Sequence, residues 1–444
     1  MKKIILFFCL FSFAIPVLSQ EGFEFVNTKS SKIRVPFKLI NNLVFIPVKV
    51  NGVEFLFLLD SGVRETILFG FDDANEVNLN HVEKIDFKGL GRSETVEGFK
   101  SSGNVLTIGK KESRNHLLYL ILDPSFNLSS FVGVSVNGIV GSAAFKNYLV
   151  EIDYAKKVVN FYKPNSKFHK TIEKKYTKVP IIIEKGKPYV NSTVRVNTTD
   201  VLVKLLIDTG NSDAVWLFDK LSDKLELPEK YFEDYLGQSI SGAVVGKRAR
   251  ISQFSIAGYK FDSPVVAYPD SISSKIISLR SGRLGSLGGE ILKRFSVVFD
   301  YTNGQLFLKK NKLFKSSFTY NKSGVEIWHT GSELVKKMIA VPDHNSVIVS
   351  VDDRKPDPKT ANFKYRVELK PIYEIGHVRE NSSAYKSGLR PADILVAIDG
   401  KPAYEYSLQE INSFLWSEDE IWIELKIRRE GKEMRFKFQL LNVL

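Results

Sequence analysis

The chain contains the same sequence pattern twice. Residues 43–62 read as a strand, a tight turn at Asn51-Gly52, a second strand and then Asp-Ser-Gly. Residues 189–210 repeat this order and end in Asp-Thr-Gly, so that the two aspartates lie 208 − 60 = 148 positions apart. Asn-Gly between apolar runs is a strong hairpin signal, because both residues tolerate positive φ. The pattern therefore predicts two related β-rich units.

A second pair of segments supports the same repeat. Residues 138–154 align without gaps with residues 285–301, and the offset between Asp153 and Asp300 is 300 − 153 = 147. A unit of this length is too long for a solenoid repeat. We therefore expect a mainly β fold built from two duplicated β-lobes. The predicted boundaries are a first lobe at 21–162, a basic, solvated linker at 163–178 and a second lobe at 179–310.

Each acidic motif follows an apolar strand, which would carry its aspartate into a buried interface. The glycine lets the backbone turn there without a clashing Cβ. The hydroxyls of Ser61 and Thr209 can satisfy buried backbone groups across the junction of two lobes. If the lobes face one another, Asp60 and Asp208 meet. Two adjacent carboxylates cannot both ionise cheaply, so such a pair shares a proton and titrates as a unit.

This arrangement resembles the pepsin/retropepsin class of aspartic peptidases over about residues 40–310. Members carry one Asp-[Thr/Ser]-Gly in each of two β-lobes, followed later by an apolar-apolar-Gly element, which here is 139–141 and then 287–288. The resemblance implies an aspartic-type endopeptidase that hydrolyses peptide bonds without a metal or other cofactor. The site residues that it implies are the catalytic Asp60 and Asp208, supported by Ser61, Gly62, Thr209 and Gly210.

Several positions depart from the pattern of that class. Val63, Arg64 and Glu65 follow the first motif, where small or polar residues are usual. Charges at Arg64 and Glu65 would disturb the shared proton by Coulomb interaction if they lie close to it. Ser286 stands where an apolar residue is usual before Leu287. The units are also short for pepsin lobes, so we favour a tandem retropepsin-like arrangement.

Other readings of the same motifs remain open. Asp-Ser-Gly and Asp-Thr-Gly also occur as ordinary turns after strands. A catalytically inactive, acid-protease-like protein that binds peptides or serves as an envelope scaffold is the alternative to a peptidase. A serine protease is excluded, because the chain shows no Gly-x-Ser-x-Gly motif and no His/Asp/Ser constellation. Failure to cleave any peptide pool, together with indifference to statine-like inhibitors, would favour the scaffold.

Residues 381–400 resemble the PDZ motif SPAxxAGLxxGDxIxxI(D/N)G. PDZ domains add a peptide as a strand at a sheet edge and hold its terminal carboxylate with backbone amides. The resemblance implies a small α+β docking domain for peptide termini, with Ser323, Gly324 and Val325 as the candidate amide loop. The predicted boundaries are a linker at 311–322 and a PDZ domain at 323–444, with a charged insertion near 336–364 that would cover its groove.

The N-terminus predicts export. Lys2 and Lys3 precede an apolar run, 4–18, that is short for a membrane span and typical of a secretory signal peptide at 1–20. We expect a periplasmic, cell-envelope-associated or secreted protein with no transmembrane segment after cleavage. Cleavage would also remove Cys9, the only cysteine, so that no disulfide supports the fold.

Charge and histidine content limit the partners further. The net charge is +13, but the basic residues are spread along the chain, so nucleic acid is not an expected partner. The six histidines form no metal-binding pattern, and we expect no metal site. A peptide or protein substrate is the partner that the motifs favour.

Overall fold

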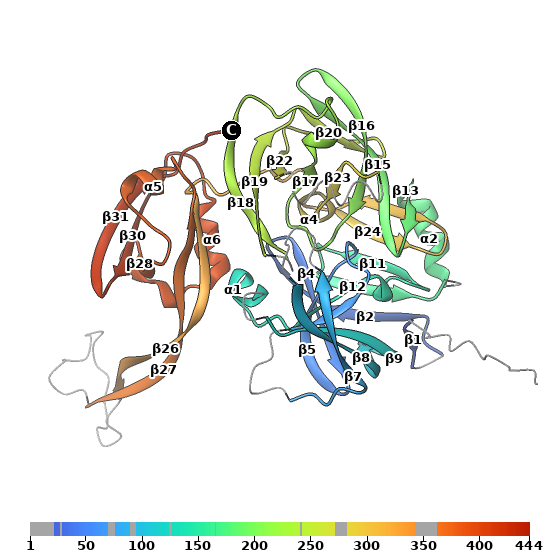
Figure 1. Ribbon diagram of the computed structural model, residues 1–444, viewed down its shortest axis with the longest axis horizontal. Coiled ribbons are helices and arrows are strands. Elements are labelled where there is room, and N and C mark those ends of the chain that lie inside the picture. Colours follow the sequence, from blue (N-terminus) through green and yellow to red (C-terminus); the bar gives the residue numbers. More distant parts are fainter. Residues whose placement is uncertain are drawn as a thin grey trace, which may run out of the picture.

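The computed structural model describes residues 22–26, 29–69, 76–88, 95–123, 127–164, 166–239, 242–270, 282–341 and 362–444. Strands dominate these residues and the helices are short, so the predicted mainly β fold is confirmed (Figure 1). The predicted signal peptide at 1–20 lies outside the described residues. None of the helices in the described part of the chain is long and apolar enough to cross a membrane.

The first half of the chain forms a nine-stranded sheet in the order β1-β9-β6-β10-β5-β4-β8-β7, with β3 paired to β4. Its strands are β1 (Glu24–Phe25), β3 (Lys38–Ile40), β4 (Leu43–Val50), β5 (Val53–Leu59), β6 (Thr66–Leu68), β7 (Val82–Lys88), β8 (Thr95–Ile108), β9 (Lys111–Ile121) and β10 (Gly138–Val140). Two short helical segments accompany them, α1 (Leu128–Val132) and η1 (Ser142–Ala144).

The second half forms a ten-stranded sheet in the order β18-β19-β22-β17-β23-β16-β15-β20-β21, with β14 paired to β15. Its strands are β14 (Ile182–Glu184), β15 (Lys187–Val196), β16 (Thr199–Ile207), β17 (Val215–Leu217), β18 (Tyr231–Ser239), β19 (Gly242–Arg250), β20 (Gln253–Ile256), β21 (Tyr259–Asp262), β22 (Val265–Pro269) and β23 (Gly285–Leu287). The helical segments among its described residues are η2 (Asp219–Leu221) and α4 (Gly289–Leu292).

The two sheets share the same local connectivity around the strand that precedes each Asp-[Ser/Thr]-Gly. In the first half, β10 runs parallel to β5 and antiparallel to β6. In the second half, β23 runs parallel to β16 and antiparallel to β17. The outer neighbours also correspond, since β6 pairs in parallel with β9 and β17 pairs in parallel with β22. The sequence repeat therefore appears in the structure as a repeat of strand order.

A third, six-stranded sheet in the order β13-β25-β24-β11-β12-β2 joins the halves. Its strands are β2 (Lys32–Pro36), β11 (Leu149–Asp153), β12 (Val158–Tyr162), β13 (Thr177–Pro180), β24 (Phe295–Asp300) and β25 (Gln305–Lys310). Glu151 of β11 faces Val298 of β24 at the middle of their antiparallel pairing. These positions differ by 298 − 151 = 147, the offset of the repeat, so an approximate two-fold axis passes between them. One continuous core of buried side chains spans both halves.

The segment predicted as a solvated linker, 163–178, is largely folded instead. It contains helix α2 (Lys167–Lys175), whose Ile172 side chain is fully buried. The ring of Phe168 stacks on Tyr162 of β12 at 3.8 Å between centroids. Lysines occupy the outward positions of this helix, which is why the composition resembles a solvated linker although one face packs against the shared sheet.

The second predicted linker, 311–322, also packs against the body of the protein. The buried guanidinium of Arg294 donates to the carbonyl oxygens of Phe314 and Ser316 in this segment. The side chain of Tyr320 is buried as well. Because the buried Arg294 guanidinium needs these backbone acceptors, its hydrogen bonds fix the conformation of residues 311–322, which lead to the C-terminal residues.

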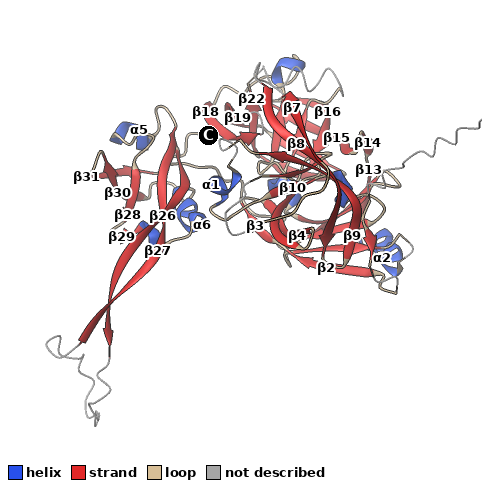
Figure 2. Cartoon of the chain, turned by 60° about the horizontal axis from the view of Figure 1, so that its bottom comes forward, coloured by secondary structure: helices blue, strands red, loops and turns tan. Residues whose placement is uncertain are grey.

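Residues 323–444, which we call the C-terminal module, form a separate six-stranded sheet with its own core. Its elements are β26 (Val325–Val341), β27 (Asn362–Val378), α5 (Ser383–Ser387), β28 (Ile394–Ile398), β29 (Lys401–Pro402), η3 (Ala403–Glu405), α6 (Leu408–Leu415), β30 (Trp422–Arg429) and β31 (Lys432–Gln439). The described ends of the predicted insertion 336–364, at 336–341 and 362–364, continue the β26–β27 hairpin away from the sheet (Figure 2). Its predicted cover over a groove involves residues 342–361, which lie outside the described residues.

The C-terminal module contacts both halves. At the first half, helix α6 lies beside helix α1 (Figure 1). The Gln409 side chain of α6 donates to the carbonyl oxygen of Val132, the last residue of α1, at 2.5 Å. Gly133 ends α1 with a positive φ of 68°, and a Cβ there would lie 2.7 Å from the Leu408 side chain. Glycine at this position thus permits the close approach of α1 and α6.

Candidate active site

Asp60 and Asp208 each follow the last residue of an inner strand. The Asp60 amide donates to the Val140 carbonyl at 3.0 Å, and the Asp208 amide donates to the Leu287 carbonyl at 2.9 Å. These bonds extend the parallel pairings of β5 with β10 and of β16 with β23 by one residue. The apolar-apolar-Gly elements therefore hold the ends of the strands that carry the two aspartates.

The structure brings the two motifs into direct contact. A Cβ on Gly62 would lie 2.6 Å from Oδ1 of Asp208, and a Cβ on Gly210 would collide with the carboxyl of Asp60. The side-chain carboxyls of Asp60 and Asp208 lie close enough for each to act on the ionisation of the other. Only glycine leaves room at the third motif position for the carboxyl of the opposite half.

The hydroxyls of the second motif position cross-link the halves symmetrically. Ser61 Oγ donates to the Ile207 carbonyl at 2.7 Å, and Thr209 Oγ1 donates to the Leu59 carbonyl at 2.7 Å. Each hydroxyl also accepts from the opposite backbone, with the Ser61 amide to Thr209 Oγ1 at 2.9 Å and the Thr209 amide to Ser61 Oγ at 3.1 Å. Both side chains are fully buried, so all four bonds form away from water.

Burial raises the pKa of Asp60 to about 8, and the adjacent charge of Asp208 contributes to this rise. Burial likewise raises the pKa of Asp208. The Gly62 amide opposes the shift at Asp60 by donating to Oδ1 at 2.7 Å, and the Gly210 amide donates to Asp208 Oδ1 at 3.1 Å. The pair therefore retains a proton at neutral pH, as expected for two adjacent carboxyls that titrate together.

Two cations of the second half act on the pair, and sequence reasoning did not identify them. Arg283 favours the ionised form of Asp208, and Lys187 favours the ionised forms of both aspartates. Arg283 lies just before β23, with its guanidinium carbon 5.4 Å from the centre of the Phe218 ring. Lys187 begins β15, directly after the turn at Lys185-Gly186. Neither residue belongs to a motif, so the primary sequence offers no signal for them.

Each half also places a tight turn against the motif region of the other half. Asn42, in the turn between β3 and β4, donates to the Ser212 carbonyl at 2.8 Å and to Glu290 at 2.9 Å. In the other direction, Gly186 lies against Ser142, because a Cβ there would be 2.9 Å from Ser142 Oγ. Ser142 and Glu290 lie within or near the short helical segments that follow β10 and β23. These reciprocal contacts fix how the two motifs face one another.

Arg64 and Glu65, which the sequence placed next to the dyad, have exposed side chains. Their region is held by its backbone instead. The Ser142 amide donates to the Val63 carbonyl at 3.0 Å, and Ser142 Oγ donates to the Arg64 carbonyl at 3.2 Å. Ser286, the polar residue in the second apolar element, is buried and pairs with Leu206 and Trp216 in the sheet.

The candidate amide loop of the C-terminal module already has acceptors within the chain. The Gly324 amide donates to Asn321 Oδ1 at 3.1 Å, and the Val325 amide donates to Ser323 Oγ at 3.0 Å. The Ser323 amide donates to the Leu415 carbonyl at 3.4 Å. A peptide carboxylate at Ser323, Gly324 and Val325 would have to replace these acceptors.

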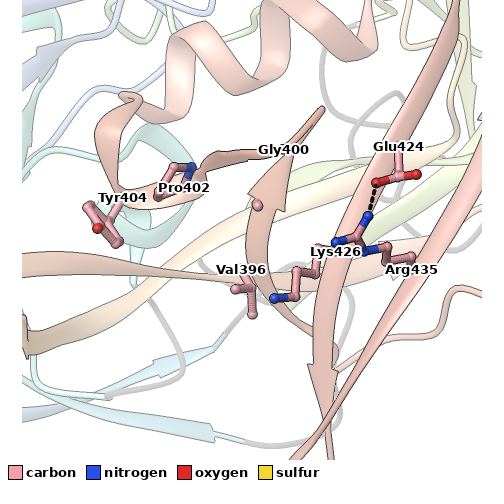
Figure 3. A pocket seen from close by; sticks show the side chains of 8 residues that line it. Val396, Gly400, Pro402, Tyr404, Glu424, Lys426 and Arg435 are labelled. Carbon is pink, nitrogen blue, oxygen red and sulfur yellow. Dashed lines mark hydrogen bonds and ion pairs between the residues drawn. The ribbon is translucent and has the colours of Figure 1, made fainter.

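A pocket of about 250 Å³ lies in the C-terminal module and away from the aspartates (Figure 3). Its polar lining includes Glu424 and Arg435, which form an ion pair at 3.4 Å, and Lys426. Within the described ranges, no three His, Cys, Asp or Glu side chains gather in a way that could hold a metal ion.

Comparison with known proteins bears on the second half. A family model described as aspartyl protease matches residues 192–290. This segment is an aspartic protease-like domain. The match includes Asp208, Thr209 and Gly210 together with β23, the strand that holds the end of β16. No curated protein matches the chain.

Proposed function

We propose that the protein is an exported aspartic endopeptidase in which Asp60 and Asp208 act as one catalytic dyad. The observation that carries this proposal is that each carboxyl lies against the motif glycine of the opposite half, at the symmetric junction of the halves. The aspartic protease-like domain at 192–290 supplies only Asp208. The first half supplies Asp60 through the same strand order, which supports a second, related lobe at 21–162.

The chemistry follows from the shared proton. The ionised carboxyl takes a proton from a water held between the two side chains, and that water attacks the carbonyl carbon of the scissile peptide. The protonated carboxyl donates its proton to the carbonyl oxygen, where negative charge develops. Collapse of the tetrahedral intermediate then breaks the C–N bond, as the carboxyl that took the proton from the water passes it to the leaving amine and the other carboxyl takes back the proton of the hydroxyl. The amides of Gly62 and Gly210 donate to the carboxyls and orient them. The hydroxyls of Ser61 and Thr209 bind the backbone of the opposite half and so hold the segments that carry the carboxyls.

We further propose that the C-terminal module is a PDZ-like docking domain for a peptide or protein. Its support is the motif at 381–400 and a sheet whose edge strand β26 packs beside helix α6. Export is proposed from the basic and apolar N-terminal segment, 1–20.

Digestion of an unfolded protein tests the endopeptidase. The mature chain is incubated with reduced, unfolded protein at acid and neutral pH, and the products are identified by mass spectrometry. We expect internal cleavage that a statine-type peptide inhibits and that Asp208→Asn abolishes. An exposed acid such as Asp200→Asn serves as the matched control and keeps full activity. Cleavage that persists in Asp208→Asn and is blocked by a serine-protease inhibitor would overturn the proposal.

A further inference from the structure

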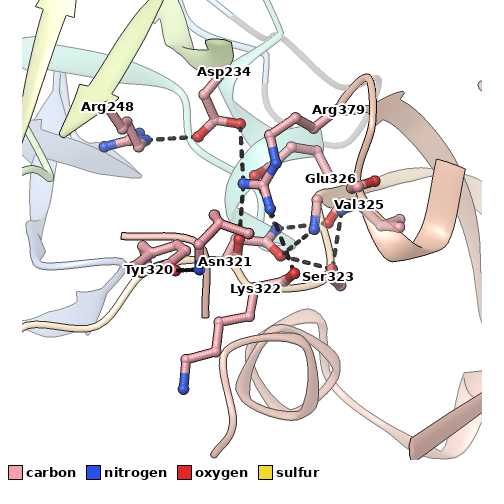
Figure 4. Close-up of polar contacts among 12 residues, drawn as sticks. Asp234, Arg248, Tyr320, Asn321, Lys322, Ser323, Val325, Glu326 and Arg379 are labelled. Atoms are coloured by element: carbon pink, nitrogen blue, oxygen red, sulfur yellow. Dashed lines mark hydrogen bonds and ion pairs between the residues drawn. The ribbon is translucent and has the colours of Figure 1, made fainter. Parts of the chain in front are cut away.

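A row of charged side chains connects the loop after Asp208 with the C-terminal module. Figure 4 shows three of its members, Arg248, Asp234 and Arg379. Arg248 of β19 binds two aspartates, with Nη1 2.6 Å from Asp213 Oδ1 and Nε 2.6 Å from Asp234 Oδ2. The other oxygen of Asp234 lies 4.0 Å from Nη1 of Arg379, at the end of β27. The charges therefore alternate in sign from contact to contact. Asp213 belongs to the second motif loop, Arg248 and Asp234 to the β18–β19 hairpin, and Arg379 to the C-terminal module.

The first end of this row fixes the motif loop. Asp213 lies five residues after Asp208, and its Oδ2 accepts from Trp216 Nε1 at 2.6 Å. Its amide donates to Asn211 Oδ1 at 2.9 Å, and the Asn211 amide donates to the Asp208 carbonyl at 3.3 Å. A displacement of Asp213 would therefore reach the backbone of Asp208 through two short hydrogen-bonded steps.

The other end is anchored in the C-terminal module. Arg379 Nη1 donates to the Asn321 carbonyl at 3.0 Å, and its backbone amide donates to the Gly324 carbonyl at 2.7 Å. Its guanidinium carbon also lies 4.0 Å from the centre of the Phe232 ring of β18. Arg379 therefore contacts the hairpin of the second half while it holds the turn at the start of β26.

Aromatic packing joins the same hairpin to the module. Tyr235 of β18 lies 6.1 Å from His377 and 6.3 Å from Trp328, measured between ring centres. Phe131 of α1 contacts Trp328 at 5.2 Å and stacks on Tyr235 at 6.0 Å. The β18–β19 hairpin, α1 and the module thus form one packed contact, through which a shift of the module would act on the hairpin.

Burial makes the row sensitive to the loss of any member. The side chains of Asp234 and Arg379 are 6% and 5% exposed, and those of Arg248 and Asp213 are 15% and 13% exposed. Removing one partner of a buried pair leaves an uncompensated charge, whereas an exposed pair contributes little. Without Arg248, Asp213 and Asp234 would both have to find new partners or move toward water.

We propose that Arg248 is a positioning residue that transmits the docking state of the C-terminal module to the dyad through Asp213 and Asp234. This inference rests on the proposed function for its kinetic consequences. The geometry itself does not depend on that function. Any ligand that shifts Arg379 or the β18–β19 hairpin would change the position of Asp208 without contacting Asp208.

A kinetic cycle tests the coupling in the full mature chain. We expect Arg248→Met to lower kcat about tenfold or more with little change in KM, because the substrate contacts are kept while the aspartate is displaced. Arg248→Lys should restore part of kcat, since it keeps a positive charge but lacks the planar fork that binds Asp213 and Asp234 together. Arg195→Met is the matched control, because Arg195 binds Asp200 at 2.7 and 2.8 Å in an exposed pair of the same half.

The decisive comparison is between single and double variants. Arg379→Met is expected to lower kcat in the wild-type background and to have little further effect in Arg248→Met. Additive effects of the two substitutions would overturn the proposal, as would kinetics of Arg248→Met that match those of Arg195→Met. Unfolding curves of each variant separate a loss of fold from a loss of positioning.

A second readout does not require activity. Trp216 donates to Asp213, so the ¹⁹F resonance of 5-fluorotryptophan at this position reports on the loop. The resonance is assigned with Trp216→Phe. We expect Arg379→Met to shift it in the wild-type background and not in Arg248→Met. An unchanged resonance in Arg379→Met would refute the coupling, even if the protein proves inactive and the proposed function fails.

Discussion

Ser61 and Thr209 exchange equivalent hydrogen bonds across the junction of the two halves. Each hydroxyl donates to the carbonyl two residues before the opposite hydroxyl residue, at 2.7 Å, and accepts from the opposite amide. Each aspartate lies between the hydroxyl residue and the carbonyl that take part in this exchange, Asp60 after Leu59 and Asp208 after Ile207. The exchange therefore fixes the spacing of their carboxyls. The contact between the halves and the candidate catalytic site are therefore the same structure.

Loss of one of these hydroxyls should destabilise the junction. Thr209→Val keeps the shape of the side chain but leaves the Leu59 carbonyl and the Ser61 amide without their partner. We expect the free energy of unfolding to fall by about 1–3 kcal/mol. Urea unfolding measures this change. Thr199→Val, at an exposed position of β16, is the control and should lie within about 0.5 kcal/mol of the wild type.

The pH dependence of stability should report the dyad. The pKa of Asp60 is about 8 in the folded chain, above its ordinary value of 3.8, because the carboxyl is buried beside Asp208. Its contribution to stability is therefore complete below about pH 4 and is lost as the pH rises through about 8. We expect Asp60→Asn to flatten the decline in stability over this interval. Equal slopes for the two proteins in urea unfolding at several pH values would contradict the raised pKa.

Glu326 should add a second pH-dependent term at the module interface. Burial and the charge of Asp234 raise its pKa from 4.5 to about 7, although Asn321, Arg248 and Arg379 oppose the shift. Its contribution is full below about pH 4.5 and declines as the pH rises through about 7. Glu326→Gln is expected to remove this decline. The prediction is wrong if the melting temperatures of wild type and variant differ by the same amount at acid and neutral pH.

Helix α2 should behave as part of the core and not as a linker. Ile172 is fully buried among Tyr162 and other side chains of the shared sheet, beside Phe168 of its own helix. Ile172→Ala is expected to lower the free energy of unfolding by about 2–5 kcal/mol. Lys170→Ala, on the exposed face of the same helix, should leave it nearly unchanged. If both variants unfold like the wild type, α2 does not contribute to the core.

The sequence was sufficient to predict the mainly β fold and to single out the residues that the structure brings together at the junction. Asp60 and Asp208 could be identified because the repeat is local in sequence, with each aspartate at the end of an apolar strand. The hydroxyl positions followed from the same alignment. These predictions needed only the pattern of each unit and the assumption that the units face one another.

The shared sheet and the long-range charges could not be predicted in the same way. The pairing of β11 with β24 joins residues about 147 positions apart, and the sequence of neither strand indicates which strand it pairs with. The many lysines of α2 make its sequence strongly polar, so the apolar face that packs on the sheet could not be recognised and the segment resembled a solvated linker. Arg248 and Arg379 lie far apart in sequence and belong to no motif, and only the packing of the module on the β18–β19 hairpin brings them near Asp234.

The central claim is that one chain supplies both carboxyls of a single dyad. It is tested most directly by the specific activity of wild type, Asp60→Asn and Asp208→Asn on an unfolded protein, measured over a wide range of enzyme concentrations. We expect both variants to lose at least about 1,000-fold in kcat and the wild-type specific activity to stay constant with concentration. Loss of activity in only one variant, with a specific activity that rises with concentration, would show instead a dyad formed between two chains.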